Sequence, residues 1–390
     1  MTRTETERCW AEIDLGALRE NSRALHALVP PGCKLMNVLK ADAYGHGAVP
    51  VARALAEEFP DDWIGVACLS EALELRAAGI RQEILILGWT SVEEAGLLAE
   101  QRLTQTLLSH EYALRLAGKA AEGGVAVSCH VKLDTGMSRI GYPCDEASMA
   151  STVEQVAEVY RTPHLEVTGI FTHFSSAYSH APEDDAYTRM QFQRLMAVCG
   201  ALEERGIAPG LRHCCSSPST VNSPEYALDL CRVGTALFGH LAEEEKLRPA
   251  KLRTVMAWKA RVAALHRVPR GGAVSYGRLY VAKRDMTLAV VTAGDADGFY
   301  RQLTNLGRVR IRGHACPVVG RVCMDMFMVD VTDFPDVRAE DEVLLLGESG
   351  GACVPCEWLF EPLKIGTSAV TCNIRARVPR IYLDPPRAGK

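Results

Sequence analysis

Short apolar runs alternate with helical patterns over much of the sequence, and this alternation limits the folds that the chain can adopt. The apolar runs predict strands at 34–39, 63–67, 83–87, 126–132, 166–171 and 232–238. Helical patterns lie between them at 50–59, 70–78, 92–100, 110–118, 148–160 and 185–205. Strands that alternate with helices pair in parallel through crossover helices. We therefore predict an α/β fold, a (β/α)8 TIM-type barrel whose catalytic groups lie at the carboxyl ends of its strands.

The pattern changes near residue 250. Segments rich in β-forming residues follow at 255–268, 286–292, 309–313, 317–322, 327–331, 342–346 and 377–383, and one short helix is expected near 356–364. Residues 9–14 also alternate as a strand, and Asp14 is typical of a helix N-cap. A chain of 390 residues exceeds the size of most single cores. We predict a barrel domain at 10–245 and a mainly β C-terminal domain at 246–390, with residues 1–12 packing against the second.

Composition excludes several classes of function. The formal net charge of −5 argues against nucleic acid as a partner, because phosphate backbones bind basic surfaces. We find no apolar run of about 18 residues that would span a membrane, and the polar N-terminus lacks a signal peptide's apolar region. We therefore expect a cytoplasmic protein without membrane contacts. Most of the fourteen cysteines are interpreted as reduced thiols. The pair Cys353/Cys356 lacks the second half of a zinc pattern. We predict no metal, with metal binding at this pair kept as a minor alternative.

The segment that most favours chemistry is 38–47, Val-Leu-Lys-Ala-Asp-Ala-Tyr-Gly-His-Gly. Lys40 follows the apolar run of a predicted strand, and a Gly-His-Gly turn, where backbone approaches a ligand closely, comes next. In a dry pocket the pKa of a lysine falls, and the free amine becomes a nucleophile that forms a Schiff base. The ordinary alternative is a lysine whose ammonium stays in water. The segment by itself favours that alternative.

The same segment resembles the lysine segment of the alanine racemase family, fold-type III enzymes that use pyridoxal 5'-phosphate (PLP). The resemblance implies that Lys40 binds the cofactor covalently and that Tyr44 donates its hydroxyl to the cofactor phosphate. Motifs in family order extend the resemblance from Trp10 to Pro379. It implies an isomerase that converts L-alanine to D-alanine, the reaction of D-alanine biosynthesis for peptidoglycan. Whether the chain serves wall synthesis, catabolism or antibiotic resistance stays open.

A second motif begins at Lys132, where residues 132–139 match the family signature Lys-x-Asp-Thr-Gly-Met-x-Arg. Taken alone, Lys132 and Arg139 would be an ordinary surface cation pair. By the resemblance, Arg139 hydrogen-bonds the phenolic oxygen of the cofactor near the substrate carboxylate. Lys132 matches a lysine that is often carbamylated to hold this arginine. His173 ends a predicted strand and alone would be an ordinary core histidine; the resemblance places it beside the pyridine ring.

Two further segments offer phosphate ligands. The family usually has Asn-Ser where this chain has Ser216 and Ser217; Ser217 keeps the phosphate-binding hydroxyl, whereas the role of Ser216 stays open. Residues 232–239 resemble Arg-x-Gly-Ile-x-x-Tyr-Gly, which implies that the backbones of Gly234 and Thr235 bind phosphate and that Arg232 faces the pyridine nitrogen. A guanidinium only donates, so this nitrogen stays unprotonated and the ring is a weaker electron sink. Proton exchange at Cα is then favoured over transamination.

The second domain carries a candidate base at Tyr276, within a segment, 273–280, that resembles the family's second catalytic segment. Alone, it would be an ordinary amphipathic surface tyrosine. Racemisation needs a proton acceptor on one face of the substrate and a donor on the other. By the resemblance Lys40 and Tyr276 are these groups, and the tyrosine comes from the other subunit of a homodimer with composite sites. Residues 321–325 match Arg-x-Cys-Met-Asp, so the expected substrate-binding residues are Arg139, Tyr276, Met324 and Asp325.

The sequence departs from the family at two aromatic positions. Asp295 stands where an entry-channel tyrosine is common, and an alignment without gaps from residue 380 puts Ser368 where another tyrosine is usual. We predict from this a roomier, more polar site that admits serine or a basic amino acid beside alanine. The alternative at Ser368 is that the alignment without gaps is shifted there, so that Ser368 does not correspond to the family's tyrosine.

Two other classes of function compete with a racemase. Basic amino-acid decarboxylases share the barrel lysine but typically place a glutamate at the pyridine nitrogen, so Arg232 counts against them. A non-catalytic PLP-binding protein of the single-barrel type lacks a β domain, whereas Tyr276 and Met324 are present here.

Overall fold

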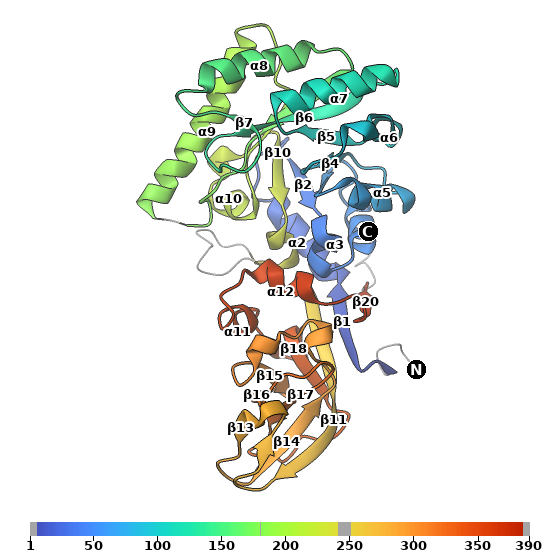
Figure 1. Ribbon diagram of the computed structural model, residues 1–390, viewed down its shortest axis with the longest axis vertical. Helices are drawn as coiled ribbons and strands as arrows, with labels where there is room; N and C mark the ends of the chain where they lie inside the picture. The colour runs from blue at the N-terminus through green and yellow to red at the C-terminus, as the bar shows by residue number, and fades with distance from the viewer. Residues whose placement is uncertain (1–5, 180, 241–250, 385–390) are drawn as a thin grey trace. The chain divides into compact units, whose positions relative to one another are not determined.

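A computed structural model describes residues 6–179, 181–240 and 251–384 (Figure 1). Contacts between Cα atoms divide the chain into two compact units. The barrel unit comprises Arg19–Ala43 and Ala48–Leu252, and the β unit comprises the residues up to Leu18, Tyr44–Gly47 and the residues from Arg253 on. The domain boundaries expected from the sequence stay a prediction.

The barrel unit is built on eight parallel strands that neighbour one another in the order β10-β2-β3-β4-β5-β6-β8-β9. Backbone bonds from Asp229 to Arg212 and from Arg232 to Cys215 connect β10 with β9 and close the ring. The strands are β2 (Lys34–Val38), β3 (Trp63–Val66), β4 (Ile84–Ile86), β5 (Thr104–Leu107), β6 (Val127–Asp134), β8 (Leu165–Phe171), β9 (Leu211–His213) and β10 (Leu230–Val233); the short β7 (Tyr142–Pro143) pairs with β6.

Helices connect these strands. They are α4 (Ala48–Ala56), α5 (Leu69–Ala77), α6 (Ala95–Glu100), α7 (His110–Glu122), α8 (Met149–Arg161), α9 (Pro182–Glu203) and α10 (Ser217–Asn222). Each of them except α10 overlaps a helical pattern predicted from the sequence. Their apolar faces are buried; in α7, for example, Leu116 and Ala113 are fully enclosed. Inside the ring, apolar side chains of several strands pack together: Met36, Trp63, Leu85, Phe171 and Leu230. Truncating such a residue to alanine costs about 2–5 kcal/mol.

Three barrel strands differ from the sequence prediction. The expected strand at 232–238 is wrong beyond Val233, because a 3-10 turn occupies Thr235–Phe238 and ends at Gly239 in a left-handed conformation (φ 77°). Strands β5 and β9 were not expected. β5 reads Thr-Gln-Thr-Leu, yet it is buried because its polar groups bond to backbone: Gln105 donates to the Gly88 carbonyl (2.9 Å) and Thr106 to that of Ile86 (2.6 Å).

The β unit contains one long sheet in the order β19-β18-β15-β16-β17-β14-β11-β1-β20, and an additional pairing of β18 with β11 curls it back on itself. All of its pairs are antiparallel except β1 with β20. Its strands are β1 (Cys9–Asp14), β11 (Met256–Val268), β14 (Met286–Val291), β15 (Arg308–Ile311), β16 (His314–Val319), β17 (Phe327–Asp330), β18 (Glu342–Ser349), β19 (Ala352–Val354) and β20 (Arg380–Leu383). The predicted barrel with a C-terminal β domain is confirmed.

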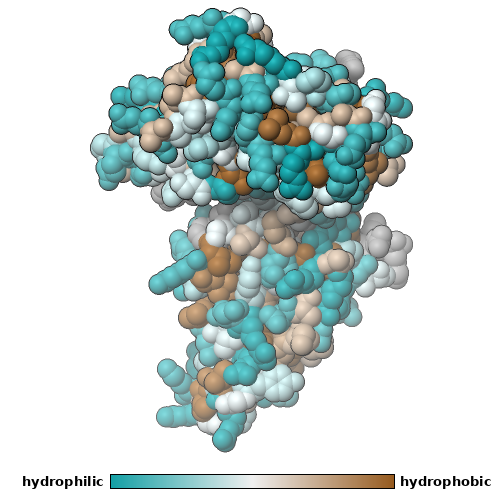
Figure 2. Space-filling model, turned by 45° about the horizontal axis from the view of Figure 1, so that its top comes forward, coloured by the Kyte–Doolittle hydropathy of each residue, from teal (hydrophilic) through white to brown (hydrophobic). Residues whose placement is uncertain are grey.

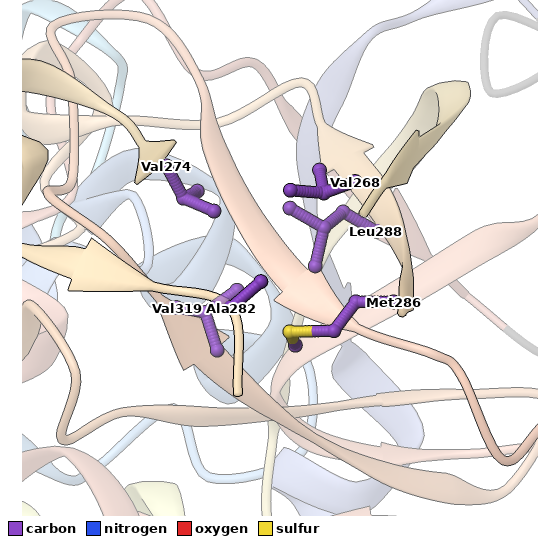
Figure 3. Packing of buried hydrophobic residues seen from close by; sticks show 6 residues of the cluster. All are labelled: Val268, Val274, Ala282, Met286, Leu288 and Val319. Carbon is purple, nitrogen blue, oxygen red and sulfur yellow. The ribbon is translucent and has the colours of Figure 1, made fainter. Parts of the chain in front are cut away.

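Strand β11 organises this sheet, because register shifts next to Trp258 and Ala264 allow it to pair with β1, β14 and β18 along its length. A hairpin of β12 (Ala273–Val274) and β13 (Tyr280–Val281) adjoins it. Figure 3 shows the apolar cluster that packs beneath this hairpin, made of Val268, Val274, Ala282, Met286, Leu288 and Val319. Helices α11 (Glu357–Phe360) and α12 (Thr367–Asn373) lie between β19 and β20 in the chain; the helix expected at 356–364 is shorter than predicted.

Hydrophilic side chains predominate on the face in Figure 2, and apolar side chains there form small separate groups. Among the residues that the structure describes, no helix is both long and apolar enough to cross a bilayer. All fourteen cysteines are free thiols, and eight of them are buried.

Candidate active site

Lys40 lies at the carboxyl end of β2, two residues beyond the last strand residue, Val38. The amide of Leu39 still bonds to the carbonyl of Gly65 (2.8 Å), which continues the sheet up to the lysine. Glu71 then accepts hydrogen bonds from the amides of Ala41 and Ala67, both at 2.7 Å. This carboxylate fixes the backbone on one side of Lys40. The sequence analysis missed Glu71, because it lies on α5, thirty residues from the site.

The segment after Lys40 has an unusual backbone. Ala41, Asp42, Ala43 and Tyr44 have φ values of 53°, 53°, 53° and 54°, a left-handed turn without a glycine. Each such residue costs about 1–2 kcal/mol relative to the right-handed form. Asp42 compensates in part, because its carboxylate accepts a hydrogen bond from the Ala48 amide at 2.6 Å. Strain of this kind is typical of functional sites.

Arg232 makes four hydrogen bonds in the barrel interior. Its guanidinium is buried and donates to the carbonyls of Thr172 (2.8 Å) and Cys214 (2.9 Å) and to a ring nitrogen each of His213 (2.8 Å) and His173 (3.1 Å). These four acceptors are neutral groups. Burial lowers the pKa of Arg232, but a guanidinium stays charged in proteins. The arrangement therefore presents a fixed positive charge at the strand ends.

Two histidines that the sequence analysis missed extend from Arg232. Because the guanidinium only donates, Nδ1 of His213 accepts, and its Nε2 proton is left to point at Nδ1 of His130, 3.0 Å away. Burial, and then the charge of Arg232, lowers the pKa of His130 to about 3 and that of His213 well below its ordinary value. Both rings are thus neutral with assigned tautomers. A signal was available: His130 lies two residues before Lys132 on β6, so both point to the same face.

Four cations converge on His173 just beyond β8. Burial lowers the pKa of this histidine well below its usual range, and the charges of Arg232, Lys132, Arg139 and Lys40 lower it further. His173 is therefore neutral, and its Nδ1 accepts from Arg232. The structure brings together these five residues, all of them predicted from the sequence, at the carboxyl ends of β2, β6, β8 and β10.

Lys132 is nearly fully buried, and burial, then the charge of Arg232, lowers its pKa to about 7. Its ammonium donates to the Leu133 carbonyl at 2.5 Å. Arg139, by contrast, is exposed at the end of a tight turn. The carboxylate of Asp134 holds this turn by accepting from the amides of Gly136, Met137 and Ser138 (2.9–3.1 Å).

Helix α9 fixes the loops that carry Arg139 and His173. Gln191 is completely buried; its Oε1 accepts from the Ser175 amide (3.0 Å), and its Nε2 donates to the His173 carbonyl (3.3 Å) and the Thr135 hydroxyl (3.4 Å). Tyr187 donates to the carbonyl of Gly136 at 2.7 Å. Helical periodicity alone did not mark Gln191 as a site residue, since glutamines are common on helix surfaces.

The predicted phosphate ligands of the barrel lie together. Ser217, at the start of α10, is buried, and its hydroxyl accepts from the amides of Gly234 (2.9 Å) and Ala236 (3.2 Å). Thr235 lies between these amides. The capping residue of α10 is Ser216, whose backbone amide donates to the Ser219 hydroxyl at 2.7 Å. Tyr44 belongs to the β unit, where burial raises its pKa to about 12, so its hydroxyl remains a donor.

The remaining predicted residues lie in the β unit. Tyr276 is 64% exposed in a turn between Ser275 (φ 65°) and Gly277 (φ 70°). The Ser275 hydroxyl donates to the Arg321 carbonyl at 2.8 Å, which joins this turn to the segment of Met324 and Asp325. Met324 is 61% exposed.

The two positions that depart from the family also lie in the β unit. Asp295 donates its amide to the Cys323 carbonyl (3.0 Å), so the structure joins it to the segment of Met324. Ser368 lies in α12, where Tyr300 donates its hydroxyl to the carbonyl of the next residue, Ala369 (2.9 Å). No group of His, Cys, Asp or Glu within the described ranges is arranged to hold a metal ion.

Comparisons with known proteins agree on one family. The model of the alanine racemase N-terminal domain matches residues 13–242, and that of the C-terminal domain matches residues 255–382. An alanine racemase from Desulfovibrio desulfuricans is 43% identical over 96% of this chain and 98% of its own length. A solved alanine racemase from Clostridium difficile superposes with a TM-score of 0.88 at 34% identity, covering 97% of this chain and 96% of that one. The Bacillus anthracis alanine racemase with bound L-Ala-P also gives 0.88, at 29% identity and the same coverage.

Proposed function

We propose that this chain, which belongs to the alanine racemase family, interconverts L-alanine and D-alanine with PLP as its cofactor. One observation carries the proposal: Lys40, Lys132, Arg139 and Arg232 converge on a neutral histidine at the carboxyl ends of barrel strands. Such a group of basic residues suits a ligand with several negative groups, because the buried charge of Arg232 needs a partner. The phosphate and phenolic oxygen of PLP and the carboxylate of alanine are such groups.

The donor set fits the cofactor. Lys40 would hold it covalently; Ser217, Gly234, Thr235 and Tyr44 would hold its phosphate; Arg139 its phenolic oxygen; and Arg232 its pyridine nitrogen, with His173 beside the ring. When bound, PLP withdraws electrons from the Cα of an attached amino acid and so acidifies the Cα proton. Arg232 moderates this withdrawal because its guanidinium donates without giving up a proton. Its four hydrogen bonds to fixed neutral acceptors keep it in place for that role.

Lys40 and Tyr276 would move the Cα proton, one on each face of the substrate, and exchange roles with the direction of reaction. We assign Tyr276 to the partner subunit's active site in a homodimer, with Met324 and Asp325 near the substrate carboxylate. The surface around the tyrosine supports this assignment, because large apolar side chains are exposed there: Leu279, Val281, Leu306, Met324 and Met326. An exposed apolar patch of this kind is typical of a protein interface.

Lys132 is proposed to be carbamylated. Carbamylation joins CO2 to a neutral amine and releases a proton, and the pKa of about 7 leaves much of this amine neutral near neutral pH. The resulting anion would lie in the field of Arg139 and Arg232, which both act on Lys132. A carbamate therefore converts a repelled cation into a partner for the arginine that binds the cofactor.

A broader substrate range is a second candidate, because Asp295 and Ser368 replace aromatic residues. Asp295 supports it, since its amide bonds to the segment of Met324 and places an anionic residue near the proposed substrate contacts. The values of kcat/KM for alanine, serine, lysine and arginine test it. A strict preference for alanine would reject the broader range and leave the alanine racemase intact. A cytoplasmic location and a role in peptidoglycan synthesis stay predictions.

The test of the main proposal measures racemisation of L-alanine by circular dichroism in the PLP-loaded protein. We expect loss of optical activity without release of CO2, a yellow absorption that borohydride abolishes, and no such absorption in Lys40→Ala. Tyr276→Phe should keep the yellow absorption and lose racemisation, because only one of the two bases is removed. CO2 release would indicate a decarboxylase, and a yellow protein without turnover would indicate a PLP-binding protein.

A further inference from the structure

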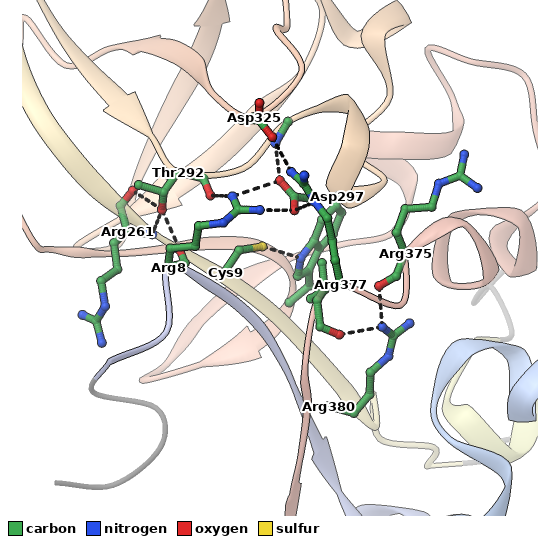
Figure 4. Close-up of polar contacts among 12 residues, drawn as sticks. Arg8, Cys9, Arg261, Thr292, Asp297, Asp325, Arg375, Arg377 and Arg380 are labelled. Carbon is green, nitrogen blue, oxygen red and sulfur yellow. Dashed lines mark hydrogen bonds and ion pairs between the residues drawn. The ribbon is translucent and has the colours of Figure 1, made fainter.

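Asp297 is a buried carboxylate in the β unit that two arginines from distant parts of the chain contact (Figure 4). Arg8 donates to both of its oxygens (2.6 and 3.2 Å), and Nε of Arg377 donates to Oδ1 at 2.7 Å. The Gly294 amide adds a bond to Oδ2 at 2.9 Å. Burial alone would raise the pKa of this carboxyl, but the bonds from Arg377 and Arg8 lower it. Asp297 is thus an anion whose position is fixed from three sides.

The turn that contains Asp297 holds the segment of Met324. The amide of Asp295 donates to the Cys323 carbonyl (3.0 Å), and that of Ala296 donates to the Met324 carbonyl (2.9 Å). Gly294 permits this close approach, since a Cβ there would lie 2.5 Å from the Met324 carbonyl oxygen and 2.6 Å from the Asp325 amide nitrogen. The backbone of residues 323–325 therefore depends on a turn that Asp297 stabilises.

Arg377 also contacts Asp325 directly. Its Nη2 donates to Oδ1 of Asp325 at 2.7 Å while its Nε binds Asp297, so one guanidinium bridges the two carboxylates (Figure 4). Arg377 and Asp325 are 40% and 54% exposed, and Asp297 is fully enclosed. The four residues Arg8, Asp297, Arg377 and Asp325 form a network in which two positive and two negative charges cancel.

We propose that Arg377 is a positioning residue for substrate binding, which rests on the proposed function of Met324 and Asp325 as neighbours of the substrate carboxylate. An aspartate at that place would repel an anionic substrate. Arg377 neutralises Asp325 and holds its carboxylate in an ion pair, which would reduce this repulsion. The residue acts through Asp325 and has no contact with the reacting atoms.

Steady-state kinetics of the PLP-loaded Arg377→Met variant test this role. Met keeps much of the side chain's length, and Asp297 keeps Arg8 and the Gly294 amide. We expect KM for L-alanine to rise about tenfold, the effect of roughly 1.4 kcal/mol of repulsion, while kcat changes by less than about threefold. Propionate is a carboxylate that cannot react, and its dissociation constant, measured by isothermal titration calorimetry, should rise by a similar factor.

Charge repair distinguishes this role from a merely structural one. The double variant Arg377→Met/Asp325→Asn removes the repelling charge and should recover most of the lost affinity. Added salt should also reduce the rise in KM of Arg377→Met, because the Debye length falls from about 30 Å at 0.01 M to about 3 Å at 1 M. Arg377→Lys keeps the positive charge but loses the fork of donors that bridges the two carboxylates; because the proposed role is charge neutralisation, its KM should stay within about threefold of the wild-type value. The matched control is Arg284→Met, which breaks the exposed pair with Asp333 in the same unit and should leave KM unchanged.

Two outcomes would overturn the proposal. One is an unchanged KM and propionate affinity in Arg377→Met; the other is a loss that neither salt nor Asp325→Asn relieves. If Arg377→Met does not fold, Arg377→Lys provides the test instead. A rise in the KM of Arg377→Lys that added salt does not reduce would also overturn the proposal. A wild-type protein that does not racemise alanine would instead reject the proposed function, so the two failures are distinguishable.

Discussion

Replacement of Lys132 by methionine tests the electrostatics of the barrel interior. Lys132 is nearly fully buried beside Arg232, and its pKa falls from 10.5 to about 7, mainly through burial. At about 1.4 kcal/mol for each tenfold change, this shift means that the charged form costs the folded protein about 5 kcal/mol relative to the unfolded chain. Methionine has a similar length and carries no charge, so Lys132→Met removes this cost.

The sign of the pH dependence follows from the two pKa values. Between pH 7 and 10.5 the unfolded chain holds a proton on Lys132 that the folded chain has lost. The free energy of unfolding therefore rises with pH in this window, by up to about 1.4 kcal/mol per pH unit. Below pH 7 the full cost is present, and above 10.5 it is gone. The stability advantage of Lys132→Met should be largest near neutral pH and shrink as the pH rises.

Urea unfolding of both proteins without PLP, in buffer free of CO2, measures this difference at several pH values. A difference that stays constant within about 0.5 kcal/mol between pH 7 and 10 would refute the reasoning. Bicarbonate provides a further comparison. A carbamate forms only on the folded wild-type lysine, so CO2 should stabilise the wild type by mass action and leave Lys132→Met unaffected. Incubation with ¹³C-bicarbonate should give a carbamate resonance in the wild type alone.

Two further substitutions test the supports of the site. Gln191→Leu leaves the His173 carbonyl and the Ser175 amide without their buried partner, and we expect a loss of about 2–3 kcal/mol in urea unfolding together with a lower kcat; a loss below about 0.5 kcal/mol would contradict this. Ser217→Ala removes the acceptor of the Gly234 and Ala236 amides and a proposed phosphate ligand, so the dissociation constant of PLP, measured by fluorescence, should rise about tenfold. An unchanged PLP affinity would exclude Ser217 from the phosphate site.

Much of the fold was predictable because the barrel strands are short apolar runs bounded by helical patterns. The exceptions have physical reasons. β5 consists mainly of polar residues, and it is buried because Gln105 and Thr106 find backbone partners on neighbouring strands, which a local pattern does not reveal. After Arg232, the run at 232–238 consists mostly of apolar and small residues on both sides of Gly234, so its hydropathy does not distinguish the strand that ends at Val233 from the 3-10 turn that follows.

The site was predictable where a residue lies at a strand end inside a recognisable motif. Lys40, Arg139, His173 and Arg232 all fall in this class. The left-handed turn at 41–44 was not predictable from the sequence. Of its residues, Ala-Asp-Ala-Tyr, only Asp42 is of a type that favours positive φ. The partners of Asp297 were equally hidden, since Arg8 lies 289 residues away in sequence and Arg377 80 residues away.

The buried charges of the barrel link its electrostatics to its chemistry. Arg232 is surrounded by neutral acceptors, and the imidazoles next to it are held neutral by burial and by its own charge. Because their pKa values are lowered, these histidines are neutral near neutral pH and are poor candidates for the acid that protonates Cα. The positive charge is left for anionic ligands to balance, and the proposed carbamylation of Lys132, which its depressed pKa favours, would supply one such anion. An arrangement that fixes the charge of Arg232 and keeps the histidines beside it neutral leaves proton exchange to other groups, which is the role proposed for Lys40 and Tyr276.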